Sequence, residues 1–290
     1  MALGNLAQRV LVAVVAVPIL LLILHYHRPE PTWVLLFLAS LIAMGEFFAM
    51  TLPKEDRAAA LVIGAIASAA FYWCDPAALA SYDNERLVHA ATLSGSAVPL
   101  LFAVVAPGLY YLFRFRDIPS VAGRYSATVA GIVYAGFLTT FLAKLKLIDP
   151  HHGGDTVVLV LLVAWVADTG AYFAGRFLGK SKLYEAVSPK KTWAGAWGGL
   201  AGSLAGVVAL KLLFADFLSW IDVVLIAIPG GILGQLGDLA ESLIKRSVGV
   251  KDSGDLLPGH GGILDRIDAV LFIAPYVYAY LTIRWSLWPS

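Results

Sequence analysis

The chain contains little charge and almost no cysteine. Charged residues make up 14% of its 290 positions, whereas soluble domains average about 25%, so an ordinary soluble globular domain is excluded. The single cysteine, Cys74, excludes an intramolecular disulfide and a thiolate metal site. A nucleotide-binding P-loop is excluded too, because Ala174 stands where that motif needs a glycine ahead of Gly179-Lys180-Ser181. The sequence shows no internal repeat, low-complexity tract or separate soluble domain.

Apolar residues fill the chain instead and make up 59% of it. Runs long enough to cross a bilayer, roughly 17–25 residues, recur along the whole sequence. We therefore predict an all-α integral membrane protein, a polytopic bundle of about nine transmembrane helices. The predicted segments are Val10–Leu24, Trp33–Met50, Ala58–Trp73, Leu87–Phe113, Ser126–Leu142, Thr156–Phe173, Ala194–Phe214, Ile221–Gly237 and Val270–Trp285.

The distribution of basic residues predicts the orientation of this bundle. With the N-terminus in the cytoplasm, more than two thirds of the 21 basic residues fall in inside segments, as the positive-inside rule requires. The C-terminus is then outside. We expect the first helix to be retained rather than cleaved, because no small-residue cleavage site follows Leu24.

Polar residues within the predicted helices are concentrated in the second half of the chain. We therefore divide one compact membrane domain into N-terminal scaffold helices, residues 1–125, and a catalytic region, residues 126–290. In that region Asp168 lies inside an apolar run, where an ionised side chain costs about 2.5–3.5 kcal/mol. It should have a partner or a metal, although it could instead cap a break at Gly170 or pair with Arg176.

A basic segment follows, Ser188-Pro-Lys190-Lys191-Thr-Trp193. We interpret it as a turn that presents two ammonium groups and hydroxyls to a polyphosphate. A positive-inside anchor with an interfacial tryptophan would have a similar sequence.

The predicted eighth helix carries a charged face at its inner end. If the helix continues, Asp238, Glu241, Ser242 and Lys245 are spaced i, i+3, i+4 and i+7 and share one face. An amphipathic juxtamembrane helix whose charged face meets water would show the same spacing.

The most informative segment lies between the last two predicted helices. Pro258 to Gly262 is a glycine-rich hinge whose backbone N–H groups could approach an anion, and His260 within it suits a phosphate or carboxylate contact. Asp265 and Asp268 flank Arg266 at the entrance to the last helix, where an aspartate can also be a simple cap. Alternating cations and carboxylates in a largely apolar protein indicate phosphates and a divalent metal.

These residues resemble the signature of a known family. Ser242-x-Ile-Lys-Arg-x4-Lys251-Asp-x-Gly-x2-Leu-Pro-x-His260-Gly-Gly-Ile-x-Asp265-Arg-Ile-Asp268 is similar to the signature of phosphatidate cytidylyltransferases, or CDP-diacylglycerol synthases. The segment from Asp168 to Trp193 also resembles this family, except that Ala194 replaces its usual glutamate. The resemblance is specific over about residues 168–268.

The resemblance implies that CTP and phosphatidate react to give CDP-diacylglycerol and pyrophosphate at the cytoplasmic face of the inner membrane. It implies Mg²⁺ as the cofactor, with K⁺ as a candidate second metal, a possible homodimer and no nucleic-acid partner. The implied metal ligands are Asp238 and Asp265, with Glu241 and Asp268 as second choices. Phosphates would be held by Lys245, Arg246, Lys251 and Arg266, a phosphate oxygen or metal by Ser242, and the CTP triphosphate by Lys190 and Lys191; Ser188, His260 and Asp168 complete the expected substrate contacts.

Three other activities are alternatives to this one. A CTP-dependent kinase acting on a polyprenol-type alcohol would use similar residues. A CDP-alcohol phosphotransferase would need an Asp-Gly-x2-Ala-Arg run, which the sequence lacks. A transporter would place buried charges near the bilayer midplane, commonly in two repeated halves, whereas the charges here gather at one face.

Overall fold

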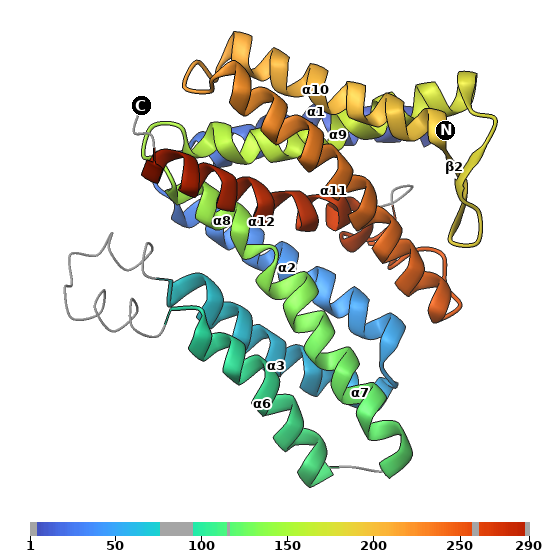
Figure 1. Ribbon diagram of the computed structural model, residues 1–290. Coiled ribbons are helices and arrows are strands. Elements are labelled where there is room, and N and C mark those ends of the chain that lie inside the picture. The colour runs from blue at the N-terminus through green and yellow to red at the C-terminus, as the bar shows by residue number, and fades with distance from the viewer. Residues whose placement is uncertain (1–4, 76–94, 115–116, 257–260, 288–290) are drawn as a thin grey trace.

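The computed structural model describes residues 5–75, 95–114, 117–256 and 261–287, and for residues 5–13 only the backbone. The helices are α1 (Asn5–His25), α2 (Glu30–Thr51), α3 (Lys54–Trp73), α6 (Ala97–Arg114), α7 (Ile118–Gly131), the π-helical segment η1 (Ile132–Phe137), α8 (Thr140–Leu147), α9 (Gly153–Leu178), α10 (Trp193–Leu213), α11 (Trp220–Ser247) and α12 (Leu264–Leu287). Two short strands, β1 (Lys182–Tyr184) and β2 (Ser188–Thr192), lie between α9 and α10 (Figure 1).

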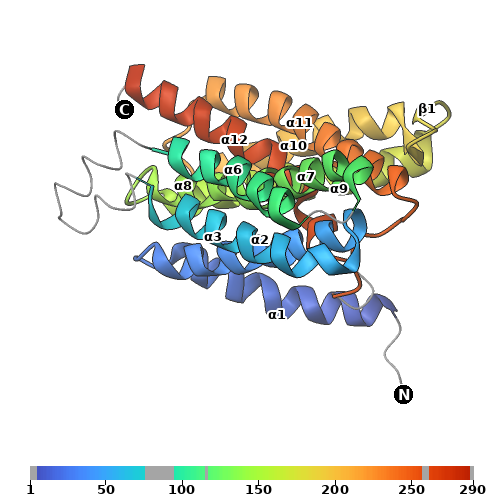
Figure 2. The ribbon, with the colours of Figure 1, turned by 90° about the horizontal axis from the view of Figure 1, so that it is seen from below.

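The helices form one bundle (Figure 2), in which α6 and α11 are inclined to α9, α10 and α12 (Figure 1). Seven of the described helical segments are long and apolar enough to cross a membrane, and α7, η1 and α8 form one of them over residues 118–147. The prediction of a helical membrane protein is confirmed at this level. Helices α1 and α3 do not reach the same criterion: α3 begins with four charged residues, Lys54 to Arg57, and the apolar part of α1 whose side chains are described is short.

Several predicted boundaries differ from the observed ones. Helix α11 continues ten residues beyond Gly237, because its charged face is held by contacts within the protein. The predicted segment Leu87–Phe113 corresponds in part to α6, which begins at Ala97, and residues 87–94 lie outside the described part of the chain. The prediction of a turn over Ser188 to Trp193 is wrong: residues 188–192 form β2, paired antiparallel with β1.

Glycines bring α9 and α10 into the most extensive contact between any two of the described helices. A Cβ atom on Gly170 would lie 2.3 Å from the carbonyl oxygen of Gly198, and one on Gly202 would lie 2.4 Å from that of Val166. Small residues allow backbones to approach this closely, which stabilises helix pairs in membranes. Helix α9 passes through Gly170 without a break, so the alternative in which Asp168 caps a break there is wrong.

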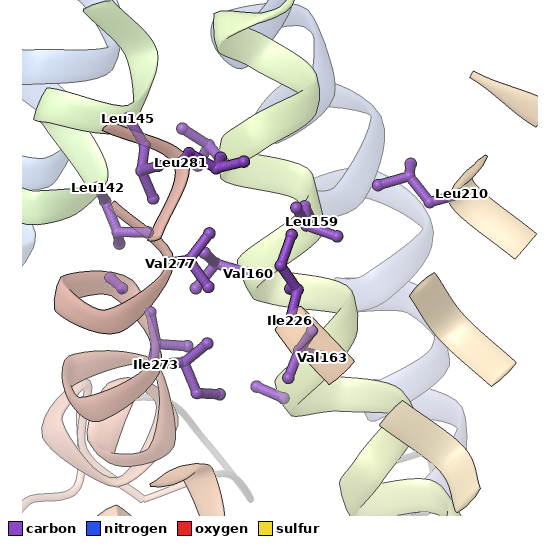
Figure 3. Packing of buried hydrophobic residues seen from close by; sticks show 14 of the residues in the cluster. Leu142, Leu145, Leu159, Val160, Val163, Leu210, Ile226, Ile273, Val277 and Leu281 are labelled. Carbon is purple, nitrogen blue, oxygen red and sulfur yellow. The ribbon is translucent and has the colours of Figure 1, made fainter. Parts of the chain in front are cut away.

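An apolar core joins the C-terminal helices to α1 and α2. Figure 3 shows part of it, with labelled side chains from α8, α9, α10, α11 and α12: Leu142, Leu145, Leu159, Val160, Val163, Leu210, Ile226, Ile273, Val277 and Leu281. Large apolar side chains also cover the outside of the bundle. Because lipid tails are as apolar as these side chains, close packing rather than removal from water holds the helices together. This core packs α9, α11 and α12 against one another.

Candidate active site

The predicted site residues gather at one end of the bundle. This is the end where α1 begins, the β-hairpin projects and α11 ends (Figure 2). Its side chains come from the last part of α9, the hairpin, the last turns of α11 and the first turns of α12.

Lys245 is the centre of a buried ion cluster. Its ammonium nitrogen lies 2.6 Å from Glu241 Oε2, one turn back on α11, and 2.6 Å from Asp265 Oδ1 on α12. The side chains of Lys245, Glu241 and Asp265 are only 9%, 1% and 7% exposed. The shared face predicted for α11 is confirmed by these contacts. In this arrangement Lys245 pairs with two carboxylates, one on α11 and one on α12, and joins the ends of these helices.

Asp265 also organises the loop before its own helix. Its carboxylate accepts hydrogen bonds from the backbone N–H of Gly262 at 2.9 Å and from that of Ser253 at 3.0 and 3.2 Å. Gly261, the residue before Gly262, has a φ of +77°, a conformation that favours glycine. Asp265 is the second residue of α12, and the N–H groups that it accepts belong to the preceding loop, so the structure shows a loop contact and an ion pair to Lys245 in place of the simple helix cap.

A second ion pair ties the hairpin to α11. Lys191, near the end of β2, places its ammonium nitrogen 2.7 Å from Asp238 Oδ2, and the Ser242 hydroxyl donates to Asp238 Oδ1 at 3.4 Å. Thr192 then starts α10, since its side-chain oxygen accepts from the backbone N–H of Gly195. Strand β2 therefore presents Lys191 to the carboxylates of α11.

Further carboxylates surround this pair. Asp168 on α9 interacts electrostatically with Asp238, Lys191 and Arg266, and Asp268 interacts with Asp238 and Asp168. Asp168 is exposed and lines a small pocket between α9, α11 and α12. Arg176, its alternative partner, donates instead to the hydroxyl of Tyr172.

Other predicted residues are not drawn into the cluster. Arg246 donates to the carbonyl oxygen of Val250 in its own loop. Lys190 and Lys251 are exposed, and their side chains make no ion pair or hydrogen bond within the described ranges. Ser188 pairs with Tyr184 in the hairpin. His260 lies outside the described residues.

Sequence reasoning missed two residues of the region. Glu46 on α2 accepts backbone N–H groups from Ile263 and Leu264 at 3.0 and 2.8 Å. A lone glutamate in an apolar run was a usable signal, by the same argument that singled out Asp168. Tyr134 on η1 interacts electrostatically with Glu241 and Asp268, and its buried hydroxyl has no hydrogen-bond partner among the described residues. A tyrosine in an apolar run gives no such signal.

The oxygen donors of this region suit a hard divalent cation. Glu241 Oε1 is buried and has no hydrogen-bond partner in the described part of the protein, and the carboxylates of Asp238, Asp168 and Asp268 repel one another. Residues 5–75, 95–114, 117–256 and 261–287 contain no group of three such side chains already arranged around one point. Lys191 and Lys245 neutralise Asp238 and Asp265 instead, so these ion pairs must open for a cation to reach both carboxylates.

Fold and site together define a polytopic membrane protein that holds facing cations and carboxylates at one end of its bundle. The sequence matches the model of the "Cytidylyltransferase family" over residues 7–284, and the chain therefore belongs to this family.

Three relatives, each named phosphatidate cytidylyltransferase, illustrate the similarity. A Brucella suis protein is 46% identical over 151 residues, 52% of this chain and 55% of the relative. A Bacillus subtilis protein is 38% identical over 158 residues, covering 52% and 56%. A Synechocystis protein is 34% identical over 227 residues, covering 68% and 75%. The matched region thus spans about half the length of the first two relatives and three quarters of the third.

Proposed function

We propose that this protein transfers the cytidylyl group of CTP to phosphatidate, giving CDP-diacylglycerol and pyrophosphate. The observation that carries the proposal is the meeting of Lys191 and Asp238 with the cluster of Lys245, Glu241 and Asp265 at one end of a membrane bundle. Cations suited to phosphates and carboxylates suited to a metal would serve a reaction between a lipid phosphate at the membrane surface and a soluble nucleotide. The names of the relatives agree with this activity.

The proposed topology is nine membrane spans with the site facing the cytoplasm, in the inner membrane of a bacterium. Helix α1 begins and α12 ends at opposite ends of the bundle (Figure 2), which supports an odd number of crossings. The bias of basic residues toward the segments at the site end supports a cytoplasmic location. A homodimer is proposed from the family resemblance alone.

In the proposed reaction, an oxygen of the phosphatidate phosphate forms a bond to the α-phosphorus of CTP. The bond between the α-phosphorus and the oxygen bridging to the β-phosphate breaks, and pyrophosphate leaves. A phosphate monoester is largely ionised near neutral pH because its second pKa is about 6, so no residue has to remove a proton. Catalysis then depends on positioning and on charge neutralisation.

The cations would neutralise the phosphates. Lys191 would exchange Asp238 for the nucleotide triphosphate, with Lys190 beside it on β2. Arg266 on α12, which interacts electrostatically with Asp168, would neutralise a further phosphate oxygen. Lys245 would hold a phosphate oxygen or keep Asp265 in place, and Ser242 would donate to a phosphate oxygen or bind the metal. Arg246, Lys251, Ser188 and His260 remain proposed substrate contacts. Each of these side chains carries a positive charge or a hydrogen-bond donor that suits a phosphate oxygen.

Asp238 and Asp265 are the proposed metal ligands, with Glu241 and Asp268 as further oxygen donors. When bound, Mg²⁺ would neutralise charge on the phosphate oxygens during transfer. K⁺ remains a candidate second metal.

The proposal is tested with purified protein in detergent, given phosphatidate, Mg²⁺ and CTP labelled separately on cytosine and on the γ-phosphate. We expect cytosine label in the organic phase and γ-label released as pyrophosphate. A parallel reaction contains a polyprenol in place of phosphatidate, and γ-label entering that lipid would identify a kinase. Folded protein that transfers neither label would favour transport.

A further inference from the structure

Glu46 contacts a loop that follows it by more than 200 residues. It lies within α2, in the part of the chain predicted to be scaffold, and is half-buried. One of its oxygens accepts from the backbone N–H of Ile263 at 3.0 Å; the other accepts from that of Leu264 at 2.8 Å and from the Ser253 hydroxyl at 3.2 Å. Both carboxylate oxygens are therefore used.

These partners stand on both sides of the loop between α11 and α12. Ser253 belongs to its first part, while Ile263 is the last residue before α12 and Leu264 is the first residue of that helix. The first N–H groups of a helix lack partners within the helix and carry partial positive charge. A carboxylate suits this position, so Glu46 satisfies the start of α12 and fastens the loop to it.

Two glycines make room for this carboxylate. A Cβ atom on Gly254 would lie 2.9 Å from a Glu46 oxygen, and one on Gly262 would lie 2.4 Å from the other. Larger side chains at these positions would push Glu46 away from the loop. At both glycines the backbone of the loop therefore approaches the Glu46 carboxylate closely.

Asp265 closes the same loop from within. It accepts hydrogen bonds from the backbone N–H groups of Ser253 and Gly262. The Ser253 hydroxyl also donates to Glu46, and so does the backbone N–H of Ile263, which follows Gly262. Moving the first turn of α12 away from Glu46 would therefore also move Asp265, and with it the contact to Lys245.

We propose that Glu46 is a positioning residue for the transfer reaction: from α2 it fixes the loop and the first turn of α12, and so sets the place of Asp265. It acts through Asp265 and takes no part in the bond-making step. This inference rests on the proposed function, because the reaction it serves is cytidylyl transfer.

The test compares wild type with Glu46→Gln, which keeps the shape of the side chain but removes its charge and one acceptor. We expect kcat for cytidylyl transfer to fall at least tenfold while KM for CTP changes less than about threefold, because the variant loses the charge-assisted hydrogen bonds that place Asp265 but no contact to CTP. Thr51→Val is the control on the same helix, where the hydroxyl bonds only the carbonyl oxygen of Phe47 among the described residues; it should leave kcat unchanged.

Hydrogen exchange measured by mass spectrometry follows the loop independently of activity. In Glu46→Gln the amides of a peptide covering residues 261–266 should exchange at least tenfold faster, with peptides of α9 unchanged. Unchanged kcat in the variant overturns the proposal, and so does reduced kcat with unchanged exchange. If Glu46→Gln does not fold, Ser253→Ala replaces it, because this variant removes the hydroxyl that donates to Glu46. Ser253→Ala should also lower kcat, and a wild-type kcat would overturn the proposal. A wild-type protein without transfer activity refutes the proposed function, while the exchange experiment still tests the positioning.

Discussion

Lys245→Met should destabilise the protein because it leaves the buried Glu241 carboxylate without its partner. Lys245 is the partner of Glu241 Oε2, and Glu241 Oε1 already has no hydrogen-bond partner in the described structure. After the substitution Glu241 would be a bare carboxylate that is 1% exposed, whereas Asp265 would keep its bonds to Ser253 and Gly262. Breaking a buried ion pair by removing one partner costs about 3–5 kcal/mol.

The prediction is measured as the thermal unfolding midpoint in detergent. At about 2–4 °C per kcal/mol, Lys245→Met should lower Tm by on the order of 10 °C. The double variant Glu241→Gln with Lys245→Met should recover roughly half of that loss, because it removes the unpaired charge. Lys54→Met, an exposed lysine at the start of α3, is the control and should change Tm by less than about 1 °C. An unchanged Tm in Lys245→Met, or a double variant less stable than the single one, would refute the reasoning.

Other substitutions test the hairpin and the close glycine contacts. Lys191→Met should lower kcat/KM for CTP by about 10- to 100-fold in steady-state assays, because a charge-assisted contact contributes about 1.5–3 kcal/mol. The control is Lys182→Met on β1, where the lysine bonds the carbonyl oxygen of Pro189; this variant should keep the wild-type kcat/KM for CTP. Gly262→Ala should reduce both transfer and Tm, since its Cβ would lie 2.2 Å from Ser253 Oγ. Gly202→Ala should lower Tm by separating α9 from α10, whereas Gly123→Ala, with open space around its Cβ, should not; equal effects of the two would contradict the packing argument.

The local part of the site could be predicted from the sequence. The spacing of Glu241 and Lys245 places them one turn apart on any helix, and the structure confirms this contact. The position of Asp265 at the start of a helix was likewise predictable, since an apolar run begins just after it. Long apolar runs located most of the membrane helices for the same reason: their signal is contained within a single segment.

The contacts between distant segments could not be predicted in this way. No local pattern indicates that Lys191 pairs with Asp238, because the choice of partner depends on how the hairpin lies against α11. The strand β2 contains a proline and two lysines within five residues, a composition that favours a turn. The partners of Glu46 are set by the packing of α2 against the loop, which only the three-dimensional structure reveals.

The most direct test of the central claim is the initial rate of cytidylyl transfer by Asp265→Asn. The variant keeps the size of the side chain but removes the charge that faces Lys245 and is proposed to bind the metal. Asp216→Asn, an exposed aspartate between α10 and α11, is the matched control. The account predicts transfer at background level in folded Asp265→Asn and a wild-type rate in Asp216→Asn. Near-wild-type transfer by Asp265→Asn would contradict the assignment of this cluster as the active site.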